Sequence, residues 1–146
     1  MRTSFYKRAL IFILAIFILL PTLSACVKKI TLDDAKNTTG KLFSALSAGD
    51  CVAVTKLMHT SSGVNTLSVS SFISEVADVT GGRLSDGVTN IRHAGYQELP
   101  YNGGYKFRIR GTLCIGTVAN VQFKVTLITD AQGYGIDEID IGGVDI

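Results

Sequence analysis

Three cysteines and two histidines are among the side chains of this 146-residue chain that could act as nucleophiles, bases or metal ligands. Cys26, Cys51 and Cys114 lie far apart and His59 and His93 are scattered, so the paired spacing of a zinc site is missing. The sequence also holds no GxSxG, P-loop or HExxH motif. We therefore expect no metal and no cofactor. If the protein were an enzyme, His59 or His93 could act as a general base together with a carboxylate in a pocket.

Cys26 differs from the other two cysteines because of the residues before it. A positive head, twelve unbroken apolar residues from Ala9 to Leu20 and a small-residue site after Pro21 together indicate a secretory signal. The signal ends in Leu23-Ser24-Ala25-Cys26, which resembles the lipobox of bacterial lipoproteins. In that family the Cys sulfur receives a diacylglyceryl group, the preceding peptide is removed, and the freed amine is usually acylated. The resemblance implies a signal peptide over residues 1–25 and lipidation at Cys26. The alternatives are an uncleaved transmembrane anchor and cleavage without lipid.

The lipid would hold the protein on a membrane of the bacterial cell envelope, because two or three acyl chains anchor a protein stably. Val27 rather than Asp follows Cys26, and in proteobacteria the family trend then favours the outer membrane, facing the periplasm, over the inner membrane. Loss of residues 1–25 leaves 121 of the 146 residues, enough for one domain. Three basic residues leave with the signal, so the net charge changes from +2 to −1. This balance excludes a general surface for nucleic acid.

Cys51 and Cys114 remain as an even pair in an oxidising compartment, which predicts a disulfide between them. Such a bond would close a loop of roughly sixty residues and contribute roughly 4 kcal/mol on the chain-entropy estimate. The alternative is two separate buried thiols. Strict strand alternation places Cys114 on the polar face of its strand, away from the helices, unless a bulge at Gly111 turns it inward.

Three helices are expected before the strands. The first begins after Thr31 as N-cap and ends at Gly49, and Asp50 caps a short second helix that carries Cys51 on its apolar side. The third begins near Ser70 or Ser71 and stops at Gly81-Gly82.

Four strands follow, over residues 88–97, 105–115, 121–127 and 134–141, separated by glycine-rich turns. The last strand breaks its alternation between Ile136 and Ile139, which indicates a bulge. Helices followed by hairpins predict an α+β fold, with the N-terminal helices packed on one face of a curved, mainly antiparallel four-stranded sheet.

At this point the chain resembles the NTF2-like (cystatin-like) superfamily, and especially its small envelope lipoproteins. The resemblance rests on the segment from Leu42 to Asp50, on the link Gly81-Gly82-Arg83-Leu84, and on the order of elements over about residues 31–142. It implies a lipidated tether over residues 26–30 and a single NTF2-like domain over residues 31–146. The superfamily contains enzymes, ligand binders and assembly modules, so the fold alone does not define a function.

Four basic residues are expected to project from one face of the sheet and to form a local basic patch: Lys106, Arg108, Arg110 and Lys124. This patch is either a solvated outer face or a site for an anionic partner. A divalent-cation site among Asp137, Glu138, Asp140 and Asp145 is disfavoured, because alternation splits these residues between the two faces.

The sequence therefore predicts a non-enzymatic envelope lipoprotein. It would hold a small NTF2-like domain against a membrane and bind a protein partner or a hydrophobic ligand. One alternative is a small-molecule enzyme that uses the cone between helices and sheet, with His59 or His93 as base. Another is an accessory subunit of a secretion, pilus or surface assembly, for which a homodimer formed through the sheet would be natural.

Overall fold

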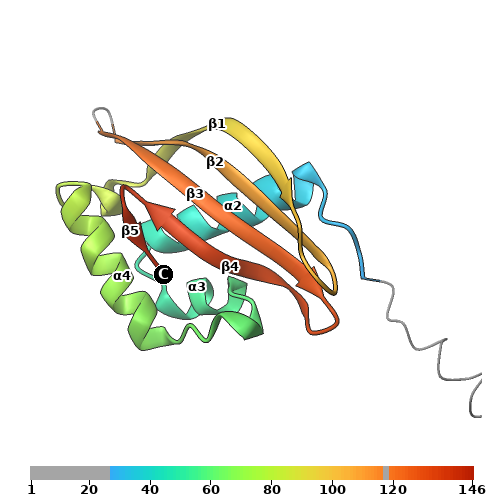
Figure 1. Ribbon diagram of the computed structural model, residues 1–146. Coiled ribbons are helices and arrows are strands. Elements are labelled where there is room, and N and C mark those ends of the chain that lie inside the picture. Colours follow the sequence, from blue (N-terminus) through green and yellow to red (C-terminus); the bar gives the residue numbers. More distant parts are fainter. Residues whose placement is uncertain (1–26, 117–118) are drawn as a thin grey trace, which may run out of the picture.

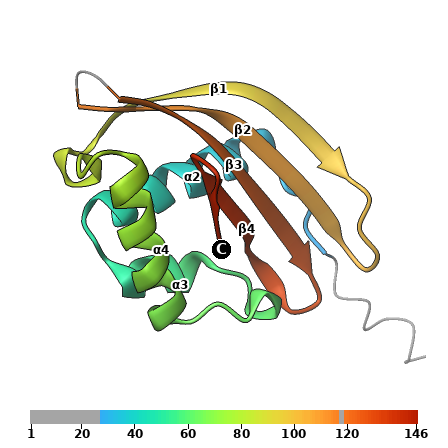
Figure 2. The same cartoon turned by 60° about the vertical axis from the view of Figure 1, so that its left-hand side comes forward.

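The computed structural model describes residues 27–116 and 119–146. Its α-helices are α2 (Leu32–Ser47), α3 (Cys51–Leu57) and α4 (Thr66–Val79), with 3₁₀ turns at Thr60–Ser62 and Leu84–Asp86. The strands are β1 (Val88–Leu99), β2 (Tyr105–Ile115), β3 (Ala119–Asp130), β4 (Gly133–Ile141) and β5 (Val144–Asp145). The predicted α+β class is confirmed, and the sheet arches over the three helices (Figures 1 and 2). The lipobox and Cys26 lie outside the described residues.

Local sequence signals set the helix ends. Thr31 and Asp34 form a reciprocal capping box at the start of α2, and the Asp50 carboxylate accepts the backbone N–H of Ala53 to cap α3. The start of α4 was predicted four to five residues too late. Asn65 caps this helix by accepting the N–H groups of residues 67 and 68. None of Thr66, Leu67 and Ser68 is buried, and the apolar residues that guided the prediction begin only at Phe72.

The sheet is an antiparallel meander in the order β1-β2-β3-β4-β5. Five strands are therefore present instead of the predicted four. The additional strand, β5, turns back through Gly142 and Gly143, whose φ angles are +63° and +90°, and pairs with the end of β4. A two-residue strand is too short to produce an alternating pattern, which is why the sequence did not reveal it.

The inner face of the sheet packs against the helices and fills the space between them. Phe43 of α2 and Phe123 of β3 meet edge to face, with ring centroids 5.0 Å apart. Phe123 lies opposite Gly111 of β2, where a Cβ would stand 2.9 Å from the Phe123 ring. Large aliphatic side chains of this core come from both layers, among them Leu42, Leu46, Ile109, Leu113, Ile115, Leu127, Ile136, Ile139 and Ile141. Helices and sheet thus share one hydrophobic core.

The predicted bulge in β4 is confirmed at Asp137. Leu127 pairs with Ile136 but Thr126 pairs with Glu138, so Asp137 is the extra residue of β4. The bulge corrects the expectation that alternation separates the nearby acids. Asp137, Glu138 and Asp140 all form ion pairs with Lys106 or Lys124, on the face of the sheet that points away from the helices.

Candidate functional site

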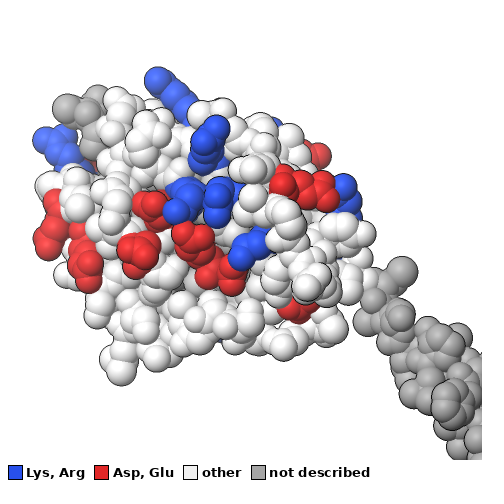
Figure 3. Space-filling model, viewed as in Figure 1, with Lys and Arg blue, Asp and Glu red and all other residues white. Residues whose placement is uncertain are grey.

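The four predicted basic residues lie on the outer face of β2 and β3, but acids on β4 neutralise three of them. Lys106 Nζ lies 2.7 Å from a carboxylate oxygen of Asp137. Lys124 Nζ lies 2.9 Å from Glu138 and 3.3 Å from Asp140. Figure 3 shows this arrangement as a basic cluster in the middle of the face, with acidic side chains beside it. The face therefore carries alternating basic and acidic side chains in ion pairs, which we call the ladder, and not a purely basic patch.

Arg108 joins the same ladder through its neighbours. Its Nε donates to Thr126 Oγ1 over 3.4 Å, and one Nη lies 3.9 Å from Glu138. The hydrogen bond from Lys124 holds the pKa of Glu138 below its usual range, and the same bond raises the pKa of Lys124. The ion pairs therefore favour the charged form of both partners.

Arg110 is the exception in this row. It is exposed, and within residues 27–116 and 119–146 no carboxylate lies at ion-pair distance from its guanidinium. Its side chain lies across Gly95 of β1, where a Cβ would stand 2.5 Å from Arg110 Nε. The missing side chain at Gly95 thus leaves the space that the arginine occupies.

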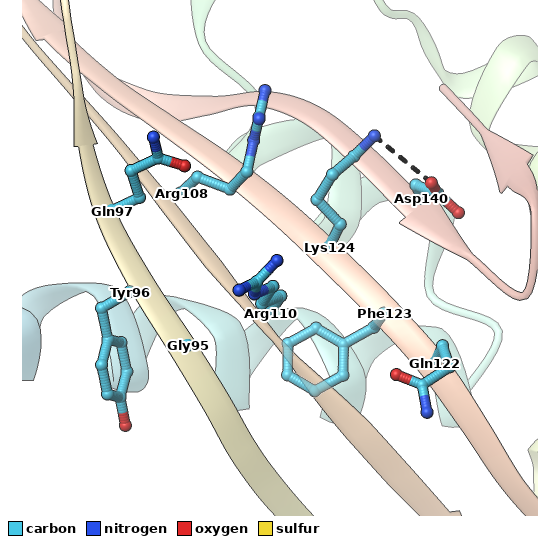
Figure 4. A pocket seen from close by; sticks show the side chains of 9 residues that line it. All are labelled: Gly95, Tyr96, Gln97, Arg108, Arg110, Gln122, Phe123, Lys124 and Asp140. Atoms are coloured by element: carbon cyan, nitrogen blue, oxygen red, sulfur yellow. Dashed lines mark ion pairs between the residues drawn. The ribbon is translucent and has the colours of Figure 1, made fainter.

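A hollow of about 400 Å³ surrounds Arg110 on this face, and we call it the outer hollow. Figure 4 shows Arg110 between the residues of β1 and those of β3. The outer hollow is lined by Gly95, Tyr96, Gln97, Arg108, Arg110, Gln122, Phe123, Lys124 and Asp140. A guanidinium presents N–H donors in a planar fork that fits a carboxylate or a phosphate. The arrangement can therefore bind an anionic group, with side-chain amides on both sides.

Sequence reasoning missed the neighbours of Arg110. Gly95 interrupts a strand, which is a signal of a bulge or of a close approach by another group, and β1 does shift register between His93 and Gly95. Gln97 and Gln122 carry no such signal, because only the strand register places them beside the arginine.

The predicted Cys51–Cys114 disulfide is absent from the structure, where both residues are free thiols. The register of β2 and β3 runs through Gly111 without a shift, so no bulge in β2 turns Cys114 inward. On the outer face, its thiol donates to Asn120 Oδ1 over 3.3 Å. Cys51 packs against the core from the helical side. The two thiols therefore lie on opposite sides of the sheet, which corrects the prediction.

His59 is buried and fastens the segment after α3 to the sheet. Its backbone N–H donates to Ile136 O over 2.7 Å, and its Nδ1 accepts the backbone N–H of Ser61. Nε2 lies 3.2 Å from Asp130 Oδ1, an ion-pair distance, although it has no well-aligned hydrogen-bond acceptor. Asp130 has a pKa below its usual range, first because Gln132 donates its backbone N–H and also because Tyr101 and His59 lie beside it.

These contacts bring Ser61, His59 and Asp130 together, an arrangement that their positions in the sequence do not indicate. Ser61 Oγ lies 2.7 Å from Nδ1 of the imidazole. The backbone N–H of Ser61 donates to the same nitrogen over 3.2 Å, so Nδ1 is unprotonated and accepts both the N–H and the hydroxyl of Ser61. Both hydrogen bonds close a turn over residues 59–61.

His93 lies elsewhere, on the inner side of β1. Its ring centroid is 6.1 Å from that of Phe123, and its Nδ1 is buried without a partner in the described part of the chain. Burial lowers the pKa of His93, and the charge of Lys36 lowers it further. Among residues 27–116 and 119–146, no carboxylate forms an ion pair with His93 of the kind that a general base uses.

Residues 27–116 and 119–146 contain no cluster of three or more His, Cys, Asp or Glu side chains able to hold a metal ion. Within the same residues, no helix has the length and apolar character needed to cross a membrane. Comparison of the chain with known protein families, with curated proteins and with solved structures finds no match.

Proposed function

We propose that the protein is a bacterial envelope lipoprotein, anchored through lipid on Cys26, with a single NTF2-like domain that binds a partner and performs no turnover. The binding site is the outer hollow, and the group that it takes is anionic, a carboxylate or a phosphate on a partner protein or ligand. The lipobox residues Leu23-Ser24-Ala25-Cys26 support the anchor. Helices packed on one face of a curved sheet support the NTF2-like assignment.

One observation carries the binding proposal: among the four predicted basic residues of β2 and β3, Arg110 alone has no acidic partner in the described chain. A cation placed over a hollow and flanked by amides is open to a bidentate anion. The packed interior between helices and sheet further favours binding at the surface over binding in an internal cone.

The anchor is tested by Cys26→Ser in the native host. We expect an unprocessed precursor that incorporates no radiolabelled palmitate, whereas the native protein is processed and labelled. Normal processing and labelling of the variant would exclude lipidation at Cys26.

The binding site is tested by Arg110→Glu together with a photo-crosslinking amino acid at Gln97. Arg110 is the informative position, because reversal of Lys106 or Arg108 would also repel the acids that pair with them. We expect a discrete crosslinked product that disappears with Arg110→Glu and persists with Lys56→Glu, an exposed reversal on α3. Both substitutions should leave the fold intact, because surface changes usually cost little stability. A product that persists with Arg110→Glu would contradict the site.

Loss of the biological phenotype in folded His59→Ala or His93→Ala, with no effect of Arg110→Glu, would favour the enzymatic alternative. A crosslinked product formed between two copies of the chain, or with subunits of a surface assembly, would identify the partner as the assembly alternative requires.

A further inference from the structure

The segment that follows Cys26 is part of the folded domain. Ile30 is 4% exposed and belongs to the hydrophobic core. Lys29 Nζ lies 2.9 Å from Glu98 of β1, and Lys28 Nζ lies 3.3 Å from Asp34 of α2. Both ion pairs are exposed and individually weak, so the burial of Ile30 is the principal attachment. The chain is thus held by the domain from residue 28 onward.

These attachments all lie at one end of the molecule. Ile30 lines a small hollow together with Thr129 and Tyr134, which flank the turn between β3 and β4. Lys29 also lies over the ring of Tyr105, at the turn between β1 and β2. Figure 1 shows the N-terminal segment leaving the domain beside these turns. We call this region, residues 31–34, 100–104 and 131–132, the turn end.

Chain length then limits how far the turn end can stand from a bilayer. Four residue steps separate Ile30 from Cys26, a reach of at most about 14 Å. In contrast, β2 extends from Tyr105 at the turn end to Ile115, a rise of about 33 Å at the usual spacing of a strand. The opposite end of the sheet therefore lies well beyond the reach of the tether.

We propose that the domain stands on the membrane on its turn end, with β1–β4 rising away from the bilayer. This inference rests on the proposed lipidation of Cys26. Arg110 lies five residues beyond Tyr105, about 17 Å along β2. The outer hollow is therefore held above the headgroups of its own membrane, and its anionic ligand comes from a protein or a soluble molecule.

The orientation is measured with full-length, lipidated protein in phosphatidylcholine–phosphatidylglycerol vesicles that contain an acceptor-labelled lipid. Cys51→Ser and Cys114→Ser remove the free thiols, and a donor dye is placed on Asn102→Cys at the turn end or on Ser85→Cys at the opposite end. We expect energy transfer to be several-fold stronger from position 102 than from position 85. Equal transfer from both positions, or stronger transfer from position 85, would overturn the orientation.

A longer tether provides the matched control. A flexible Gly-Ser insertion between Val27 and Lys28 should leave the protein bound to vesicles and reduce the difference between the two labels. An undiminished difference would overturn the short tether as the cause of the orientation, because the domain would then stand on its turn end without it. Flotation distinguishes failure of the anchor from failure of the orientation. Protein that does not float with the vesicles contradicts lipidation, whereas floating protein without a difference between the labels contradicts only the orientation.

Discussion

At the scale of single residues, Gly111 is required by the packing between β2 and its neighbours. A Cβ at this position would collide with the backbone oxygen of Arg92 and stand 2.9 Å from the Phe123 ring. We expect Gly111→Ala to destabilise the protein by about 1–3 kcal/mol, the usual cost of overpacking. Gly40, inside α2, has no atom within 4 Å of its would-be Cβ, so Gly40→Ala should stabilise by about 0.5–1 kcal/mol. Urea unfolding measures both, and a neutral Gly111→Ala would contradict this packing.

The two thiols give a second prediction at this scale. Because Cys51 and Cys114 are free and lie on opposite sides of the sheet, folded protein that was never reduced should react with an alkylating reagent at both positions. Mass spectrometry of the intact domain measures the two added groups. A reductant should leave the melting temperature unchanged. If both thiols were unreactive, or if the reductant lowered the melting temperature, the result would contradict the free thiols and support a disulfide.

At the scale of elements, the segment after α3 depends on the buried imidazole of His59. Removal of the ring would leave a cavity beside β4 and would leave the Ser61 N–H without its acceptor. We expect His59→Ala to destabilise by about 1–3 kcal/mol and to accelerate amide hydrogen exchange around residues 58–62 and 136. Ser61→Ala keeps the backbone donor and the ring, so its effect should be clearly smaller. Equal effects of the two variants would place the contribution in the hydroxyl.

The elements also show how far sequence reasoning reaches. Thr31 and Asp50 are strong local caps, so the starts of α2 and α3 were predicted, and the broken alternation around Asp137 revealed the bulge of β4. The start of α4 was misplaced because its first three residues, 66–68, are not buried and add nothing to its apolar face. The outer hollow was not predictable, because it depends on which side chain of β2 lies against Gly95 of β1. Register between strands is a long-range property that periodicity along one strand does not contain.

The same limitation explains the difference between the predicted basic patch and the observed ladder. Lys106, Arg108 and Lys124 were correctly placed on one face by alternation, but their partners belong to β4. A bulge of one residue turned Asp137 and Glu138 to the same side and neutralised the row. Among the described residues Arg110 has no such partner, because its cross-strand neighbours are Gly95 on β1 and Lys124 on β3.

At the scale of the whole molecule, the shifted pKa values predict how stability depends on pH. His93 has a lowered pKa in the folded state, so as pH falls through the usual range of histidine, near about 6.5, the unfolded chain binds protons that the folded chain does not. The lowered pKa values of Glu138 and Asp130 act in the same direction at lower pH, where carboxylates ordinarily titrate. The raised pKa of Lys124 contributes stability that is lost only at strongly alkaline pH.

Stability should therefore be greatest between neutral and mildly alkaline pH and should fall in two stages on acidification. The first stage belongs to His93, whose ring packs near Phe123 and is repelled by Lys36 when it is protonated. We expect the stability of His93→Leu to change little between about pH 7 and pH 5. Without the imidazole, neither the folded nor the unfolded chain binds a proton at this position. The later, carboxylate stage should remain, because Glu138 and Asp130 are unchanged. Urea unfolding at a series of pH values measures both stages. If the free energy of unfolding of His93→Leu fell with pH over the first stage as much as that of the native protein, another group would be responsible for that stage. This result would contradict the role given to His93.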